Sequence, residues 1–190
     1  MSNPSRAGVF GGSFDPPHLA HTLAALWALE TGEVDRILIV PVATHPFGKE
    51  CGAPCEHRME MCRLAFRRLE HHVEISDIET RLGGVSYTYR TIQALMDERP
   101  GTSFRLIVGS DVVGDLPKWR NGRELLKLAP VLELPRPGAA SRDSAAQEGI
   151  FLPAISSTRV REALRSGQSA RQMLGAEVWR YIKTNGLYPS

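Results

Sequence analysis

Long apolar runs, paired cysteines and dense basic stretches are all scarce in this sequence of 190 residues. No apolar run approaches the roughly 20 residues of a membrane-spanning helix, and the first residues lack the apolar stretch of a signal peptide. The three cysteines, Cys51, Cys55 and Cys62, are odd in number and form no CxxC pair, which argues against a disulfide framework and supports a zinc site only weakly. We therefore expect free thiols, no membrane partner and a cytoplasmic location.

The overall charge balance excludes little more. The formal net charge is +2, and 23% of the residues are charged, so nothing indicates a coat of basic groups for a nucleic-acid polymer. With 42% apolar residues, the chain is long enough for one domain with a real core and short for two. We expect a single domain over residues 1–190, and the oligomeric state stays open, a homo-oligomer included.

Short β-rich runs alternate with helical patterns along the chain. The runs RILIV and RLIV are continuously apolar, which is typical of strands covered on both faces of a parallel sheet. This order predicts an α/β fold, doubly wound around a mostly parallel sheet, with a short C-terminal helical part, about residues 155–190, packed on the domain. The predicted strands are 8–10, 36–42, 73–76 and 104–108, with weaker ones at 131–134 and 150–152; the predicted helices are 18–30, 56–69, 89–98, 158–166 and 176–185, and 136–149 is predicted to be a surface loop.

The first motif that could carry chemistry is GGSFDPPHLAH, which follows a strand and opens a helix. Gly11 and Gly12 let the backbone turn and approach a ligand closely, and the helix start offers backbone N–H groups to phosphate. His18 and His21 are three residues apart and can donate hydrogen bonds to phosphate oxygens. A plain turn with two surface histidines and a metal pair with Asp15 are the alternatives. We favour phosphate, because a turn needs no histidines and a metal site would need a third ligand.

The second motif is ISSTRVR, at the start of a later helix. Ser156, Ser157 and Thr158 could be ordinary helix caps. Arg161 changes the balance, because its guanidinium can fold over the same helix opening and pair with a polyphosphate. We expect the two motifs, far apart in the chain, to converge on one polyphosphate.

Three weaker signals stand elsewhere. Gly109 and Asp111 follow the strand at 104–108, where ligands gather in open α/β sheets; Asp111 could contact a ribose or adenine, or simply cap a helix. Lys49 lies in a loop and could reach phosphate or be solvated. Trp119 could stack on a flat ring or serve as packing.

Together these residues resemble a known family. GGSFDPPHLAH is similar to the GGSFDPPHxGH motif of bacterial nicotinate mononucleotide adenylyltransferases, and ISSTRVR matches their ISSTxxR signature. Both motifs are specific to the nucleotidyltransferase superfamily, and the Ser86-Tyr87-Thr88 segment points to the nicotinate branch. The resemblance implies a Rossmann-like nucleotidyltransferase fold. It also implies transfer of the adenylyl group of ATP to the 5′-phosphate of a pyridine mononucleotide in NAD biosynthesis, with Mg²⁺ accompanying ATP and no metal ligand from the protein.

The resemblance also implies residue roles. The catalytic residues would be His18, His21 and Arg161. ATP would be bound by Gly11, Gly12, Ser13, Phe14, His18, His21, Gly109, Asp111, Ser156, Ser157, Thr158 and Arg161. The acceptor nucleotide would be bound by Lys49, Tyr87, Thr88, Arg90 and Trp119.

Four departures from the family pattern bear on the acceptor and on activity. Ala20 stands where the family has Gly, Arg90 where it has an acidic residue, Glu133 in a usually apolar strand, and Lys49 only loosely matches a PHK segment. The alternatives are therefore the same chemistry on nicotinamide mononucleotide or another phosphate acceptor such as phosphopantetheine, or a nucleotide-binding homologue that has lost catalysis.

Overall fold

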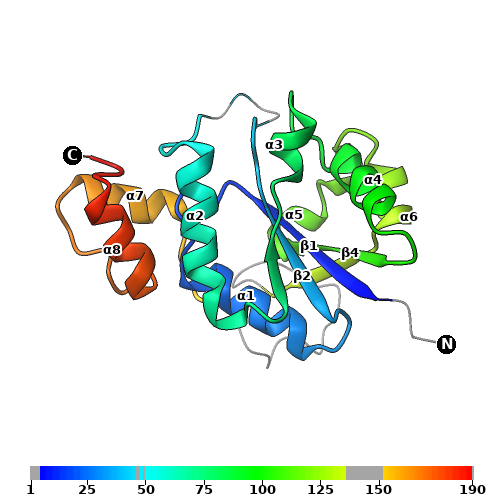
Figure 1. Cartoon of the computed structure of the whole chain (residues 1–190), viewed down its shortest axis with the longest axis horizontal. Coiled ribbons are helices and arrows are strands. Elements are labelled where there is room, and N and C mark those ends of the chain that lie inside the picture. Colours follow the sequence, from blue (N-terminus) through cyan, green and yellow to red (C-terminus); the bar gives the residue numbers. More distant parts are fainter. Residues whose placement is uncertain (1–4, 46–47, 49, 136–151, 190) are drawn as a thin grey trace.

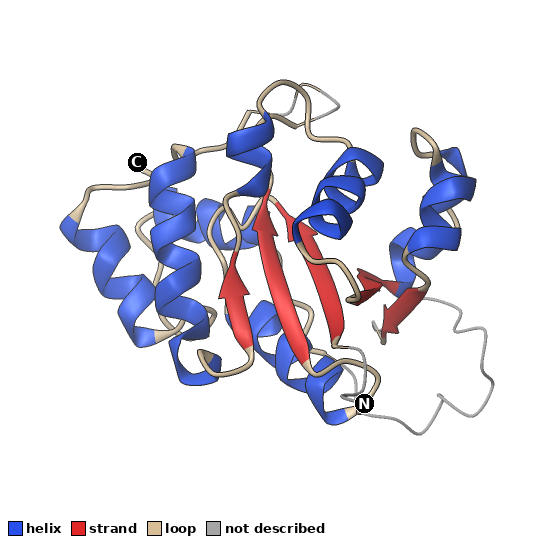
Figure 2. Ribbon diagram, turned by 45° about the vertical axis from the view of Figure 1, so that its right-hand side comes forward, coloured by secondary structure: helices blue, strands red, loops and turns tan. Residues whose placement is uncertain are grey.

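A computed structural model of the chain describes residues 5–45, 48, 50–135 and 152–189. Five strands form one parallel sheet in the order β3-β2-β1-β4-β5, and Figure 2 shows helices on both sides of it. The strands are β1 (Arg6–Gly12), β2 (Arg36–Pro41), β3 (Val73–Ile75), β4 (Ser103–Gly109) and β5 (Val131–Leu134). The doubly wound class predicted from the sequence is confirmed. Because the chain winds outward from β1 first on one side and then on the other, the strand order reverses between β1 and β4, where such sheets form their ligand crevice.

The long helices lie close to their predicted bounds, and three short ones were not predicted. The helices are α1 (Leu19–Glu30), α2 (Cys55–Phe66), α3 (Ile78–Leu82), α4 (Thr88–Glu98), α5 (Ser110–Val113), α6 (Gly122–Leu128), α7 (Ser157–Arg165) and α8 (Ala176–Thr184), with 3₁₀ turns at Arg67–Leu69 and Leu116–Lys118. The first of these turns takes up the end of the helix predicted over 56–69. The missed helices α3, α5 and α6 have 5, 4 and 7 residues, too few to display a repeating apolar stripe.

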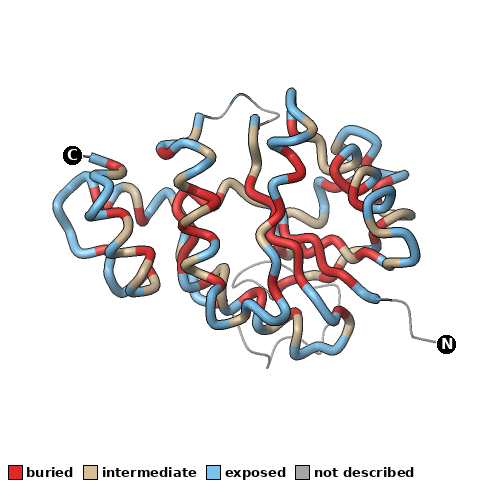
Figure 3. Tube along the Cα trace, viewed as in Figure 1, coloured by how far each residue is buried: buried red, intermediate tan, exposed pale blue. Residues whose placement is uncertain are grey.

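Alternate residues of the central strands face two separate cores. In β2, Ile37 and Ile39 belong to a cluster with residues of α1 and α2, while Leu38 and Val40 belong to a cluster with residues of α4 and α6. Figure 3 shows the buried strands between the two helical layers. Both faces of the sheet are therefore covered by helices at β2, which explains why this strand is continuously apolar.

The last two helices pack beside α2 rather than on the sheet (Figure 1). They build a third apolar cluster whose members include Met61, Val160, Leu164, Val178, Ile182 and Tyr188. The predicted loop 136–149 lies outside the described residues, as does the weak strand 150–152 except for Leu152, which is buried but not in a strand. Among the described residues, no helix has the length and apolarity needed to span a bilayer.

Candidate active site

The segment that follows β1 is held in place by a buried arginine of α2. Arg58 is only 2% exposed, and its guanidinium donates to the backbone oxygens of Ala53 at 3.1 Å, Ser13 at 2.8 Å and Val42 at 2.7 Å. One side chain thus joins the ends of β1 and β2 to the start of α2. A buried guanidinium is tolerated here because backbone oxygens satisfy its donors.

The ring of Phe14, in the first motif, lies in the core. Its backbone is in the left-handed region, with φ of 46°, and this turns the ring into the core, where it is 1% exposed. The ring packs edge-on against Phe10 and Phe66 and lies 4.9 Å from the ring of His21. The ring is therefore enclosed by protein and packs behind His21; that Phe14 binds ATP stays a prediction.

The two histidines of the first motif lie against each other. The rings of His18 and His21 are stacked with centroids 3.7 Å apart, and the backbone N–H of His18 donates to Nδ1 of His21 at 3.1 Å. A neutral imidazole that accepts at Nδ1 carries its proton on Nε2. His21 can therefore present an Nε2–H donor, and this hydrogen bond fixes the direction in which it points. His18 is 3% exposed, so it is the more enclosed of the pair.

The backbone at the α1 opening is less available than predicted. The N–H of His18 is taken by His21, that of Leu19 donates to the oxygen of Met173 at 3.0 Å, and that of His21 donates to the oxygen of His18 at 2.9 Å. The prediction that the helix start offers N–H groups to phosphate is wrong for these three amides. Side chains and the helix dipole remain to attract an anion here.

The second motif sits directly against the first. The hydroxyl of Ser157 donates to the backbone oxygen of Pro16 at 2.9 Å, and Nη1 of Arg161 donates to the backbone oxygen of Asp15 at 2.7 Å. These contacts join segments more than 140 positions apart. The two helix openings lie side by side, as predicted; that they share a polyphosphate stays a prediction.

The hydroxyls of Ser156 and Thr158 in the second motif accept hydrogen bonds from different donors. Ser156 is a true helix cap, since its Oγ accepts from the N–H of Arg159 at 3.2 Å. Thr158 accepts instead from Nη2 of Arg161 at 3.3 Å, which steadies the guanidinium. The side chain of Arg161 is only 14% exposed, so little water screens its charge.

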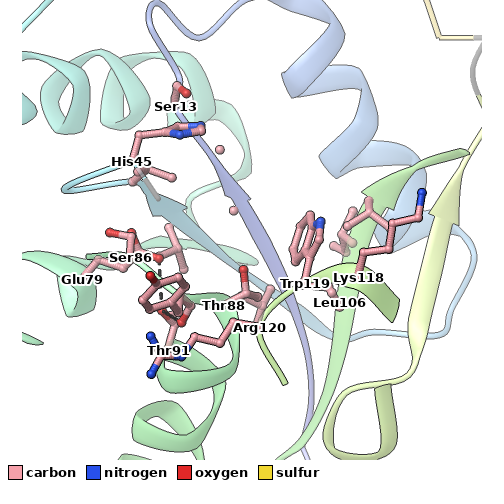
Figure 4. A pocket seen from close by; sticks show the side chains of 18 residues that line it. Ser13, His45, Glu79, Ser86, Thr88, Thr91, Leu106, Lys118, Trp119 and Arg120 are labelled. Atoms are coloured by element: carbon pink, nitrogen blue, oxygen red, sulfur yellow. Dashed lines mark hydrogen bonds between the residues drawn. The ribbon is translucent and has the colours of Figure 1, made fainter. Parts of the chain in front are cut away.

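A cavity of about 570 Å³ opens at the carboxyl ends of the central strands (Figure 4). It brings together six residues predicted to touch ATP or the acceptor: Gly11, Gly12, Ser13, Tyr87, Thr88 and Trp119. An added Cβ at Gly11 would have no protein atom within 4 Å. The protein's own packing therefore does not need a glycine there, and its absent side chain leaves space in the cavity.

Other predicted residues lie away from this cavity or cannot be placed. Arg90 donates to the backbone oxygens of Gly83 and Leu82, each at 2.7 Å, so it caps the end of α3 and is absent from the cavity lining. Gly109 ends β4 and Asp111 lies in the first turn of α5, at the predicted edge of the sheet. Lys49 falls outside the described residues.

Two cations missed by the sequence analysis stand beside Trp119. Arg120 lines the cavity with its guanidinium carbon 4.6 Å from the centre of the Tyr87 ring. Lys118 also lines it and pairs with Asp115 at 2.7 Å. Figure 4 shows Trp119 between Lys118 and Thr88, on the opposite side of the cavity from His45. In the PKWR segment, the sequence pattern indicates only the tryptophan as a ligand contact.

Glu79 is a buried acid of the cavity that sequence reasoning also missed. It is 7% exposed; its oxygens accept from the N–H of Ala43 at 3.2 Å and from the hydroxyl of Thr91 at 3.1 Å. Burial raises the pKa of Glu79, although hydrogen bonds from Ser86, Ala43 and Thr91 oppose the rise. The carboxyl thus ties α3 to the loop after β2 and to α4. Nothing in the local sequence distinguishes this acid from its solvated neighbours.

The acidic, histidine and cysteine side chains that the structure describes are not arranged as a metal site. Among the residues that the structure describes, no group of three or more His, Cys, Asp or Glu side chains is placed to hold a metal ion. Asp15, considered above as a metal ligand, accepts hydrogen bonds from Gly52, Ala53 and Tyr188 instead.

Known proteins share both the sequence and the fold of this chain. The Cytidylyltransferase-like family matches residues 9–163. A protein of Anaeromyxobacter sp. (strain K), named "Probable nicotinate-nucleotide adenylyltransferase", is 40% identical over 99% of both chains, and one of the same name from Oceanobacillus iheyensis is 36% identical over 95% of both. The structure of Plasmodium falciparum nicotinic acid mononucleotide adenylyltransferase complexed with NaAD has a TM-score of 0.82 at 19% identity and covers 97% of each chain, so its fold is the same.

Proposed function

The chain belongs to the nicotinate-nucleotide adenylyltransferase family, and from this premise we propose that it transfers the adenylyl group of ATP to the 5′-phosphate of nicotinate mononucleotide. The products are the dinucleotide and pyrophosphate, a step of NAD biosynthesis. The observation that carries the proposal is the contact between the two phosphate motifs, through Ser157 with Pro16 and Arg161 with Asp15, beside a cavity large enough for a nucleotide.

The chemistry is a displacement at the α-phosphorus of ATP. An oxygen of the acceptor's 5′-phosphate forms the new P–O bond as the bond to the β-phosphate oxygen breaks, and pyrophosphate leaves with that electron pair. The attacking oxygen is already anionic, so the protein needs no general base. Catalysis then rests on orienting two polyanions and on neutralising the charge of the leaving group.

The two helix openings supply the donors for the leaving phosphates. Nε2–H of His21 and the ring of His18 stand at one opening, and the guanidinium of Arg161 at the other. Arg161 keeps a hydrogen bond to Thr158, which pre-orients it before ATP arrives. Charge-assisted hydrogen bonds of this kind strengthen as negative charge grows on the leaving oxygens.

The acceptor occupies the cavity at the end of β1. Its pyridine ring stacks on Trp119, and Tyr87 and Thr88 line the same space. Gly11 lets the ligand approach the strand end without a Cβ between them. Arg120, over the ring of Tyr87, places a cation near a substrate that carries a carboxylate.

The Mg²⁺ ion belongs to the substrate in this proposal. The described residues provide no cluster of three metal ligands, and Mg²⁺ usually keeps several waters and binds through substrate phosphates. The donors available around the site are histidine, arginine and hydroxyl groups, which suit phosphate oxygens of a magnesium–ATP complex. We also propose, from the sequence, that residues 1–190 act as one cytoplasmic domain.

Product formation with defined acceptors tests the proposal. The purified protein is mixed with magnesium–ATP and, in separate reactions, nicotinate mononucleotide, nicotinamide mononucleotide or phosphopantetheine. Pyrophosphate release is followed, and products are identified by mass. We expect release with the nicotinate compound well above the other two. Faster release with another acceptor would reassign the substrate, and no release with any, despite tight ATP binding, would identify a nucleotide-binding homologue without catalysis.

A further inference from the structure

One carboxylate, that of Asp15, joins the first motif to three distant segments. Oδ2 accepts from the N–H of Gly52 at 2.7 Å, and Oδ1 accepts from the N–H of Ala53 at 3.1 Å and from the hydroxyl of Tyr188 at 2.7 Å. The side chain is 4% exposed. It lies beside Arg161, whose Nη1 is 3.5 Å from Oδ2 and donates to the backbone oxygen of Asp15 at 2.7 Å.

Tyr188 is buried and packs in the core beside the Asp15 carboxylate. The residue is 3% exposed and sits at the end of the third apolar cluster, with its backbone in the left-handed region at φ of 57°. Its ring packs on Gly52, where an added Cβ would come within 3.0 Å of the ring. Burial is the larger cause and the Asp15 carboxylate the second of a pKa of Tyr188 far above its ordinary value. The hydroxyl therefore stays protonated and donates its hydrogen bond to Asp15.

The position of the carboxylate decides what Arg161 can do. The guanidinium and the carboxylate already form an ion pair at 3.5 Å in a largely buried place, and a shorter, hydrogen-bonded pair would occupy a donor of Arg161 that the leaving phosphates need. Three other donors, two backbone amides and the Tyr188 hydroxyl, occupy both oxygens of the carboxylate, and Nη1 of Arg161 stays 3.5 Å from Oδ2 and donates to the backbone oxygen of Asp15 instead.

We propose that Tyr188 is a positioning residue: its hydroxyl keeps the Asp15 carboxylate turned toward Gly52 and Ala53, and thereby leaves the charge of Arg161 available to the polyphosphate. This inference rests on the proposed function of Arg161. It assigns a role in phosphate binding to a residue 173 positions from the motif that it serves. Tyr188 itself touches neither the substrate nor the reacting atoms.

The test compares Tyr188→Phe with the matched control Tyr181→Phe. Tyr181 also lies in the C-terminal part of the chain and also uses its hydroxyl in one hydrogen bond, to Nδ1 of His57 at 2.8 Å, away from Asp15. We expect Tyr188→Phe to raise the inhibition constant of pyrophosphate and to lower kcat, each roughly tenfold, because a donor to a charged group is lost. The KM of the pyridine nucleotide should stay within about twofold, and Tyr181→Phe should leave all three constants near those of wild type.

A second variant separates positioning from simple loss of structure. In Asp15→Asn/Tyr188→Phe the side chain can no longer form an ion pair with Arg161, so pyrophosphate should bind more tightly than it does to Tyr188→Phe alone. Melting temperatures of all variants are measured alongside. The inference is overturned if Tyr188→Phe leaves pyrophosphate binding unchanged, or if the double variant binds pyrophosphate no better than the single one. A wild-type protein that forms no dinucleotide would instead refute the proposed function, before any variant is compared.

Discussion

Replacing Gly11 by alanine should separate the demands of the substrate from those of the fold. The added Cβ would have no protein atom within 4 Å, and Gly11 is absent from the residues with positive φ, so alanine can adopt the same backbone. Alanine at a compatible position stabilises a protein by about 0.4–1 kcal/mol, because the unfolded chain loses freedom. For a chain of this size that corresponds to a melting temperature higher by about 1–4 °C.

Activity should move in the opposite direction. The new methyl would project into the cavity at the end of β1, where we place the acceptor. A ligand displaced by about 1 Å from its reacting geometry loses on the order of 100-fold in rate. We therefore expect kcat/KM for the pyridine nucleotide to fall by about that factor, while the protein melts at the same temperature or higher.

Gly8→Ala is the matched control, because it adds the same methyl to the same strand. There the Cβ would lie 2.5 Å from Cδ1 of Ile107 in the core, and overpacking of this kind costs about 1–3 kcal/mol. The control should melt earlier yet keep its kcat/KM while folded. Pyrophosphate release and thermal melting measure both variants. A Gly11→Ala protein with kcat/KM within threefold of wild type, or with a loss explained by earlier melting, would refute the reasoning.

Four further changes test other parts of the site. His18→Ala should lower kcat at least as strongly as it raises the KM of ATP, and steady-state kinetics showing only a raised KM would count against a role with the leaving phosphates. Trp119→Ala should weaken the acceptor by about 1–3 kcal/mol, as for other stacked bases, with the KM of ATP little changed; equal effects on both substrates would contradict the stacking. Arg120→Gln should lower kcat/KM for the nicotinate acceptor more than for the nicotinamide acceptor, and a constant ratio would remove it from carboxylate recognition. Burial raises the pKa of Glu79 above 4.5, so its contribution to stability is present below that pH and is lost as pH rises through the folded pKa. The free energy of unfolding of Glu79→Gln, measured in urea, should therefore rise relative to that of wild type between acid and neutral pH. Parallel plots of unfolding free energy against pH for the two proteins would contradict this.

The class of the fold was predictable because its signals are local. A strand buried on both faces is apolar at successive positions, so the RILIV run of β2 and the RLIV run of β4, with helical patterns between the strands, indicated a parallel sheet between two helical layers. The long helices carry stripes over several turns. The helices α3, α5 and α6 are too short for that, and neighbouring elements hold them in place.

The candidate site was predictable as a set of motifs but not as a set of contacts. Phe14 stands inside the first motif, yet its left-handed backbone turns the ring into the core. Arg90 was expected near the acceptor because of its neighbours Tyr87 and Thr88, but the short helix α3 presents backbone oxygens that bind its guanidinium. Glu79 resembles any solvated acid in the sequence, and only the fold brings the loop after β2 and helix α4 into hydrogen bonds with its carboxyl.

The sequence by itself determined the elements of this protein and the chemistry of its two phosphate motifs, since periodicity and residue type act over a few neighbouring positions. Only the tertiary structure decided which atoms of those motifs remain available. It paired the Leu19 amide with the backbone oxygen of Met173, set Arg161 against Asp15, and brought Tyr188 to the same carboxylate. Such choices depend on hydrogen bonds between segments more than 100 positions apart, and no local pattern encodes a partner at that distance.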